Sequence, residues 1–387
     1  MIRVCFIATG LDLGGAEVAL LALLQHLDRT RFEPSVISLT TAGIIGPRIA
    51  ALGVPVTAMG LRARPVALSS GLLRLVRQLR HERPDVVQTW MYHADLLGSL
   101  AARCAGIDNV VWCLHSSDPA PGVNKRGTVA VARLCARLSA RVPRAVVSVS
   151  HAARDVHRRL GYRARHFPVI GNGVDVARFT PDPAAGAWLR DTLGLPPTAP
   201  LVLHVGRFHP QKNHVGLVRA AARVHHARPE VHFVLAGKDI TLDNPALGPA
   251  IAAAGLAGVV HCLGPRDDAP RLMAGSDLLG LSSRSEASPL VLCEALASGI
   301  PCVTTDVGDA RAMVADCGRT VAPADEEALA AALLEVLALS RAERAALGQR
   351  ARQRAVAHFD IREMARAYEN LYTELHARGA PPSLHKS

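Results

Sequence analysis

Short β-type runs alternate with helix-type runs from the first residues of this chain, and this alternation constrains the fold more than any other feature. The helix-type runs repeat their apolar residues at helical spacing. A βαβα order of this kind predicts a parallel sheet that is covered by helices on both faces. In the first half, the predicted strands are 2–8, 35–40, 54–60, 85–91, 109–116 and 145–150, and the predicted helices are 17–27, 69–80, 95–105 and 152–160.

A segment rich in Gly, Pro and Asp at 169–186 interrupts the pattern, which then starts again. We therefore predict an α/β chain of two doubly wound, Rossmann-like domains. The N-terminal domain is expected at 1–172 and the C-terminal domain at 173–358, with a C-terminal helix in 359–387 that returns to the N-terminal domain and a disordered tail from 378. In the second half, the predicted strands are 201–208, 232–238, 259–265, 277–283 and 301–307, and the predicted helices are 214–227, 289–299, 325–339 and 359–377.

Length and composition agree with a two-domain globular chain. The chain has 387 residues, 49% of them apolar and 20% charged, and no apolar run is long enough to cross a membrane. Its start passes directly from an apolar run into a glycine loop, which favours a first strand over a signal peptide. The eight cysteines include no C-x-x-C pair and mostly lie in apolar runs, as thiols do in a reducing compartment. We therefore expect a cytoplasmic protein without disulfides or structural zinc.

The net charge of +11 is confined to one half of the chain. Residues 1–173 hold 22 Lys and Arg against 10 Asp and Glu, whereas the remainder holds 22 against 23. This asymmetry favours an anionic partner for the first half, either a membrane surface or an acidic acceptor. The alternative is an Arg-rich composition on ordinary solvated helices. Nucleic acid is not expected, because only 4% of residues are aromatic and no nucleic-acid-binding motif occurs.

Two carboxylates stand eight positions apart in "SSRSEASPLVLCEALASGIP", residues 282–301. Ser288 and Pro289 are typical of an N-cap and a first helical position, so Glu286 is expected just before a helix. Glu294 would then lie six residues past the cap, roughly 9 Å along the axis. Backbone N–H groups at the helix start could hold phosphates, while Glu294 accepts hydrogen bonds from ribose hydroxyls and Glu286 faces the group beyond the phosphates.

Two further loops carry candidate binding groups. "VGRFHPQKN" at 205–213 ends the first strand of the second domain and offers two cations, Arg207 and Lys212, which would stabilise the charge of a departing diphosphate. "TGLDLGGAE" at 9–17 is a glycine turn between a strand and a helix. Because its spacing is not G-x-G-x-x-G and no acid ends the second strand, a nicotinamide cofactor is not expected.

The stretch "SEASPLVLCEALASGIPCVTTDVGD" at 285–309 resembles the hallmark of the retaining glycosyltransferases of family four, which have the GT-B fold. The resemblance extends over most of the chain and includes "GGAE" in the first loop and "VIGNGVDVARF" at 169–179. It implies two doubly wound domains facing each other across a cleft. It also implies a metal-independent hexosyltransferase that uses a nucleotide-sugar as substrate, with UDP-sugars favoured, and that retains the anomeric configuration.

The resemblance also implies roles for individual residues. Arg207 and Lys212 would grip the diphosphate, and "LGPRDD" at 263–268 would pack against the nucleobase. His115, at the end of a predicted strand, would contact the donor sugar near the reaction centre, and His93 is a candidate for the acceptor site. The implied catalytic residues are His115 and Glu286, and the implied donor-binding residues are Gly14, Gly15, Arg207, Lys212, Arg266, Leu290, Val291 and Glu294.

Two departures from the family pattern leave the identity of the transferred sugar undetermined. Ala287 and Ser288 stand where the family has an aromatic residue, and Asp309 and Ala312 replace parts of a later motif. No D-x-D pair occurs, so neither a metal nor another cofactor is expected. The basic first half favours a lipid-linked saccharide acceptor in surface polysaccharide synthesis, at the inner face of the plasma membrane. A soluble acceptor such as an antibiotic aglycone, a GT-B sugar-nucleotide epimerase and a phosphorylase remain alternatives.

Overall fold

The computed structural model describes residues 1–61, 65–117, 119 and 125–379. The chain divides into two units. Unit 1 comprises Met1–Gly173 together with the residues from Ile361 onward, and unit 2 comprises Val174–Asp360. Most of the predicted tail lies outside the described residues.

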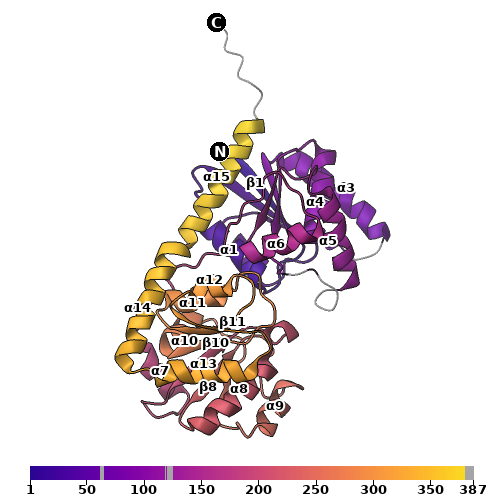
Figure 1. Cartoon of the computed structure of the whole chain (residues 1–387). Coiled ribbons are helices and arrows are strands. Elements are labelled where there is room, and N and C mark those ends of the chain that lie inside the picture. The colour runs from indigo at the N-terminus through magenta and orange to yellow at the C-terminus, as the bar shows by residue number, and fades with distance from the viewer. Residues whose placement is uncertain (62–64, 118, 120–124, 380–387) are drawn as a thin grey trace. The chain divides into compact units, whose positions relative to one another are not determined.

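Unit 1, which contains the labelled strand β1 in Figure 1, is built on a sheet. The sheet is parallel and six-stranded, with the order β3-β2-β1-β4-β5-β6. Chain order reverses beside the first strand, so β1 and β4 are neighbours, as in a doubly wound fold. The strands are β1 (Ile2–Ala8), β2 (Phe32–Ser38), β3 (Val56–Ala58), β4 (Val86–Trp90), β5 (Val110–Leu114) and β6 (Ala145–Ser148). The helices are α1 (Gly15–His26), α2 (Ile45–Ala50), α3 (Pro65–Glu82), α4 (Tyr92–Ala105), α5 (Arg126–Leu138), α6 (His151–Leu160) and α15 (Ile361–Gly379).

Unit 2 repeats this topology with the order β12-β11-β10-β7-β8-β9, again parallel throughout. Its first strand, β7, lies beside β10, as β1 lies beside β4. The predicted class of two doubly wound α/β units is therefore confirmed. The strands are β7 (Leu201–Val205), β8 (His232–Ala236), β9 (Val260–Cys262), β10 (Leu278–Leu281), β11 (Cys302–Thr305) and β12 (Gly318–Val321). The helical segments are α7 (Ala185–Thr192), η1 (Pro210–Lys212), α8 (His214–Ala227), α9 (Leu247–Ala253), α10 (Ala269–Gly275), α11 (Leu290–Ala297), α12 (Ala310–Val314), α13 (Glu326–Ala338) and α14 (Arg341–His358).

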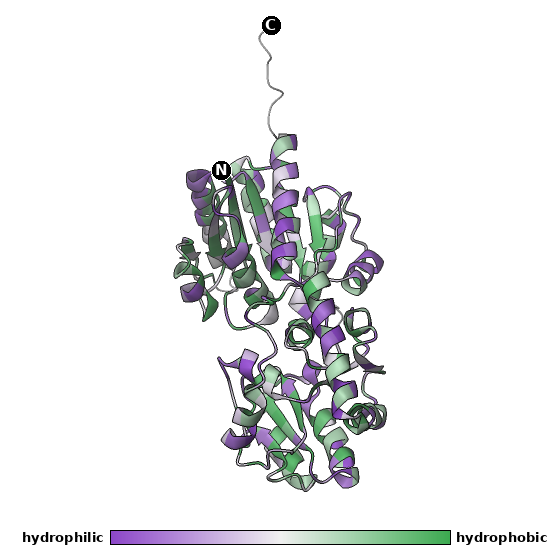
Figure 2. Ribbon diagram, turned by 90° about the vertical axis from the view of Figure 1, so that its left-hand side faces the viewer, coloured by the Kyte–Doolittle hydropathy of each residue, from purple (hydrophilic) through white to green (hydrophobic). Residues whose placement is uncertain are grey.

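Apolar strands form the centre of each unit, and the polar residues gather on the outer sides of the helices (Figure 2). In unit 1 the strands β1, β4 and β5 are almost completely buried, because helices cover both faces of the sheet. In unit 2 the core lies on both sides of β7 and β10. Such burial supplies the main stabilisation of each unit and fixes the strand ends from which the functional loops depart.

The last described helix, α15, packs on α1, β1 and β4 of unit 1. Tyr372 is the centre of this contact, since its ring meets Phe6 and Phe32 edge-on and its hydroxyl donates to Gln88 at 2.7 Å. Where the chain leaves unit 1, a Cβ on Gly173 would lie 2.6 Å from the Cα of Ile361. Only glycine permits this approach. Among the described residues, no helix combines the length and apolarity that a membrane span requires.

Candidate active site

In unit 2, the loops that follow β7 and β10 bring a cation and a carboxylate together. β7 ends at Val205, and the short helix η1 ends at Lys212. The Nζ atom of Lys212 lies 2.5 Å from Oε1 of Glu286, and the hydroxyl of Ser283 donates to the same oxygen at 2.7 Å. Arg207 is exposed and forms no ion pair with any described acidic side chain. The two predicted cations thus differ, because Lys212 forms an ion pair with Glu286, whereas Arg207 has no described carboxylate partner.

Hydrogen bonds between the two loops hold this arrangement in place. The hydroxyl of Ser282 donates to the carbonyl of Lys212 at 2.9 Å, and the N–H of Arg284 donates to the carbonyl of Gln211 at 2.6 Å. Thr305, at the end of β11, donates to the carbonyl of Ser283 at 2.6 Å. The ends of β7, β10 and β11 are therefore tied to one another before any ligand binds, which is the kind of preorganisation that electrostatic binding requires.

The helix after Glu286 begins one residue later than predicted. Pro289 is its N-cap and Leu290 its first residue, so the prediction of Ser288 as N-cap is wrong. Pro289 still has an extended ψ of 110°, which postpones the helix, and the Ser288 hydroxyl lies 3.8 Å from the sulfur of Met313. Glu294 consequently lies five residues past the cap, about 7.5 Å along the axis. This is shorter than the predicted reach by one residue's rise.

Glu294 lies on the first turns of α11 and is half-buried. Burial raises the pKa of its carboxyl to about 7, and the positive charges of Arg178 and Lys212 oppose the rise. No described group donates a hydrogen bond to its side chain. A carboxylate in this state is suited to accept hydrogen bonds from hydroxyl groups of a ligand, because these would replace the water it has lost.

Two buried histidines, which the sequence did not single out, lie beneath the Lys212 turn. His204 on β7 is fully buried, and its Nδ1 lies 2.8 Å from the carbonyl oxygen of Gly280, so Nδ1 carries the proton. His214 begins α8 and meets the ring of His204 edge-on at 4.7 Å. Burial lowers the pKa of His204 well below its usual value and that of His214 to about 4. Both are therefore neutral near pH 7.

The remaining residues of unit 2 that were predicted to bind the nucleotide-sugar donor lie at two places. Arg266 follows β9 and pairs with Asp268 through two hydrogen bonds of 2.5 and 2.8 Å. The pair raises the pKa of Arg266 and lowers that of Asp268. Leu290 and Val291 open α11, beside the Glu286 loop, and Val291 is buried. Lys212, Glu286 and α11 therefore lie close together, whereas Arg266 forms an ion pair with Asp268 after β9.

In unit 1, the predicted residues gather at the carboxyl ends of β1, β4 and β5. Gly14 is the N-cap of α1 and Gly15 its first residue. The indole N–H of Trp90, at the end of β4, donates to the carbonyl of Ala16 at 2.9 Å, which ties β4 to the glycine turn. The ring of His115, just after β5, stacks on Trp90 with 4.5 Å between centroids. Burial lowers the pKa of His115 to about 3, so its imidazole is neutral at physiological pH.

His93 lies in the first turn of α4 and is half-buried, and burial lowers its pKa. The residue before this helix, Met91, has a φ of 76°, a conformation that a side chain such as methionine rarely adopts. Two positions after His93, Asp95 is fully buried, and its Oδ1 accepts a hydrogen bond from Thr89 at 2.6 Å. Burial raises the pKa of Asp95 to about 7. Met91 and Asp95 were missed because neither a strained backbone nor burial can be recognised in "WMYHAD".

Two family models match the chain. Residues 13–178 match the model described as "Glycosyltransferase Family 4", and residues 199–338 match the one described as "Glycosyl transferases group 1". The chain belongs to the family-four glycosyltransferases. The two matches correspond to the two doubly wound units, and together they confirm the family that the motif at 285–309 indicated.

Curated relatives of this glycosyltransferase are themselves glycosyltransferases. It is 27% identical over 246 residues to the UDP-Gal:alpha-D-GlcNAc-diphosphoundecaprenol alpha-1,3-galactosyltransferase of Escherichia coli, a match that spans 63% of each chain. It is 29% identical over 332 residues to the D-inositol 3-phosphate glycosyltransferase of Salinispora arenicola, covering 77% of this chain and 73% of the relative.

A solved structure gives the same fold. The crystal structure of Anabaena HepE in complex with UDP-glucose has a TM-score of 0.84 and 23% identity, and the match covers 97% of this chain and 100% of that one. At this level of identity the likeness establishes the fold alone. The glycosyltransferase therefore has the GT-B fold.

Proposed function

We propose that this glycosyltransferase transfers a hexose from a UDP-sugar to a hydroxyl group of a lipid-linked saccharide, with retention of configuration and without a metal ion. The donor half of the proposal rests on the cluster of Lys212, Glu286 and Ser283 beside α11. Arg207 is exposed nearby in sequence, and the side chain of Glu294 accepts no hydrogen bond from any residue that the structure describes. It offers cations to a diphosphate and carboxylates to hydroxyl groups.

Each group of this cluster fits one part of a nucleotide-sugar. Arg207 and Lys212 suit the diphosphate, and their fixed positive charge takes the place of a divalent ion. In the described ranges, no three His, Cys, Asp or Glu side chains lie together as metal ligands would. Glu294 suits the ribose hydroxyls and Glu286 the sugar. In unit 1, the Gly14–Gly15 turn and His115 would bind the donor, His115 as a neutral hydrogen-bonding group.

The proposed reaction needs no carboxylate nucleophile. The bond between the anomeric carbon and the diphosphate oxygen breaks, the acceptor oxygen forms the new bond on the same face, and the acceptor proton passes to the departing phosphate oxygen. Negative charge builds up on the diphosphate during this step. Cations at Arg207 and Lys212 would therefore stabilise the transition state more strongly than the ground state. This difference in stabilisation accelerates the reaction.

A lipid-linked acceptor is favoured by two observations. The Escherichia coli relative is named for an acceptor on diphosphoundecaprenol, and the surplus positive charge of this chain lies in its first 173 residues. We therefore place the enzyme on the cytoplasmic face of the membrane, as a peripheral protein. A soluble, phosphorylated acceptor is the second candidate, because relatives such as that of Salinispora arenicola are named for D-inositol 3-phosphate.

The test is transfer from radiolabelled UDP-galactose and UDP-glucose in the presence of EDTA. Each donor is offered with GlcNAc-diphosphoundecaprenol and, separately, with D-inositol 3-phosphate. We expect labelled lipid with EDTA present and an α-linked product by NMR. If only inositol phosphate is labelled, the acceptor is the soluble phosphorylated one and the lipid-linked saccharide is excluded. Activity that is lost with EDTA and restored by manganese would refute metal independence.

A further inference from the structure

Helices α3, α4 and α5 lie side by side in unit 1, each in contact with the next (Figure 1). The exposed charges on these three helices are all positive. Asp95 is fully buried, and Glu82 is partly buried and accepts hydrogen bonds from Gln78 and Ser35. No described Asp or Glu side chain on them is exposed. The exposed arginines are Arg74, Arg77, Arg80, Arg103, Arg126, Arg133 and Arg137.

The same surface exposes one leucine from each helix. Leu73 of α3 is 58% exposed, Leu100 of α4 is 46% exposed and Leu134 of α5 is 40% exposed. Leu73 precedes Arg77 by four residues and therefore lies on the same stripe of the helix. Leu100 stands beside Arg103 in the same way. The surface formed by α3, α4 and α5 thus combines positive charge with isolated large apolar side chains.

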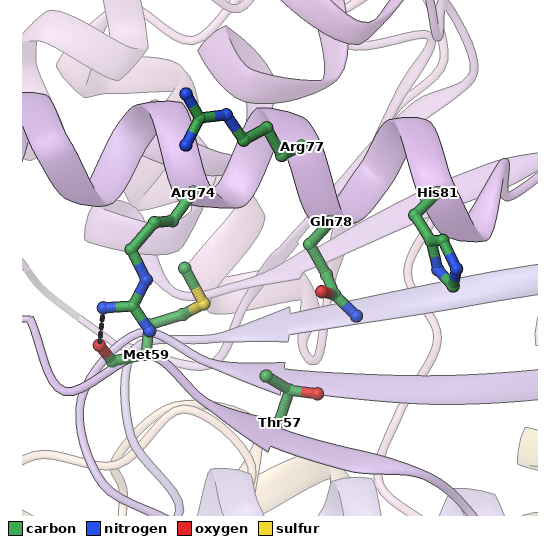
Figure 3. Close-up of a pocket in the computed structure, with 6 residues that line it drawn as sticks. All are labelled: Thr57, Met59, Arg74, Arg77, Gln78 and His81. Atoms are coloured by element: carbon green, nitrogen blue, oxygen red, sulfur yellow. Dashed lines mark hydrogen bonds between the residues drawn. The ribbon is translucent and has the colours of Figure 1, made fainter.

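A groove lies at one edge of this surface, between α3 and the residues of the edge strand β3 (Figure 3). Its volume is about 350 Å³. Arg74 donates from Nη1 to the carbonyl oxygen of Met59 at 3.2 Å, which fixes its guanidinium group at the groove and leaves other N–H donors available. Figure 3 shows Gln78 and His81 pointing from α3 toward the strands, whereas Arg77 points away from them. The lining residues are Thr57, Met59, Arg74, Arg77, Gln78 and His81.

We propose that the α3–α5 surface docks on an anionic bilayer and that the groove beside β3 receives the phosphate of a phospholipid headgroup. Arginines without acidic neighbours pair with lipid phosphates, and exposed leucines gain free energy when they enter the acyl boundary. The phosphates of a nucleic acid would also bind the arginines, but a nucleic acid would offer the leucines no apolar surroundings. The inference deepens the proposed function, since it rests on the membrane-borne acceptor for its purpose.

Docking is tested by co-sedimentation of the full chain with vesicles of phosphatidylglycerol and phosphatidylcholine, against vesicles of phosphatidylcholine alone. We expect binding to the anionic vesicles that weakens as salt rises. At about 1 kcal/mol for each arginine near the surface, the double variant Arg74→Gln/Arg77→Gln should bind about thirtyfold more weakly. The control Arg223→Gln/Arg341→Gln removes the same charge from exposed positions of unit 2 and should change binding little. Equal weakening by both pairs would overturn the proposal.

Further measurements distinguish a lipid surface from nucleic acid and from free phosphate as the ligand of the α3–α5 surface. Leu73→Ser should weaken vesicle binding but not binding to a DNA duplex. A chain that binds DNA as tightly as anionic vesicles, with no effect of Leu73→Ser on either, would refute docking on lipid. Inorganic phosphate at millimolar concentration should displace the protein only slightly, and full displacement would assign the groove to free phosphate. UDP-glucose binding by the Arg74→Gln/Arg77→Gln variant reports on the donor site, so a failed sugar transfer and a failed docking are told apart.

Discussion

Glu294 should make donor binding depend on pH, and this dependence can be calculated from its surroundings. Its carboxyl has a pKa of about 7, because the partial burial of the residue removes water from the carboxylate. The carboxylate accepts hydrogen bonds from ribose hydroxyls more strongly than the neutral acid does. Its ionised fraction rises from about one tenth at pH 6 to about nine tenths at pH 8, so affinity should rise about tenfold over this range, or about 1.4 kcal/mol.

The substitution Glu294→Gln keeps the shape of the side chain and removes the charge. Two charged hydrogen bonds would become neutral ones, at a cost of about 1 kcal/mol each, so affinity at pH 8 should fall about thirtyfold. The variant should also lose the rise between pH 6 and pH 8. Glu286→Gln is the matched control, because it removes the partner of Lys212 at 2.5 Å and leaves that cation to the diphosphate. It should spare donor binding and damage sugar transfer.

Isothermal titration calorimetry with UDP-glucose at pH 6, 7 and 8 measures all three proteins. UDP-glucose is preferred to UDP because its diphosphate carries no group that titrates in this range. The nearby His209 has a lowered pKa and would change affinity in the opposite direction, since protonation adds positive charge beside the phosphates. A flat profile for the unmodified protein, or equal weakening by the two glutamine variants, would show that the carboxylates do not have separate partners.

Two other predictions concern the turn that holds Lys212. Arg207→Ala and Lys212→Ala should each raise the barrier to transfer by about 2.7–4 kcal/mol, the scale for one preorganised donor, and kcat/KM measured with and without EDTA checks both the loss and its independence of metal. His214 has a pKa of about 4 when folded and about 6.5 when unfolded, so the unfolded state binds the proton first and stability falls as pH drops below 6.5. The contribution of His214 should reach about 2 kcal/mol at pH 5. The buried His204, whose pKa is also lowered, adds to the loss in the same direction. Faster hydrogen exchange of residues 201–214 measures the total; an opening free energy that does not change with pH, or a loss that His214→Leu does not reduce, would contradict the prediction.

The positions of the candidate groups could be predicted because parallel strands end at a common edge. Once 201–208 and 277–283 are recognised as strands, Lys212 and Glu286 must follow their carboxyl ends, and in the sheet these two strands are neighbours. The contact itself could not be predicted. The ion pair spans 74 residues of sequence, and its distance depends on hydrogen bonds of Ser282, Arg284 and Thr305 that no local pattern specifies.

Burial was the other property that the sequence concealed. Aspartate is mostly exposed in proteins and histidine occurs both inside and outside, so residue type alone does not distinguish the buried His204 and Asp95 from exposed residues of the same kind. The start of α11 was displaced by one residue for a related reason. Ser288 and Pro289 satisfy the local rules for a cap, but the tertiary setting keeps Pro289 extended and moves the first helical residue to Leu290.

The return of α15 to unit 1 has a consequence for synthesis on the ribosome. Unit 2 is continuous in sequence, whereas unit 1 needs residues from both ends of the chain. Until Tyr372 emerges, the rings of Phe6 and Phe32 lack the aromatic partner that covers them in the finished protein. The half that is translated first is therefore the half that is completed last. During that interval its exposed apolar face is the part of the nascent chain most in need of a chaperone.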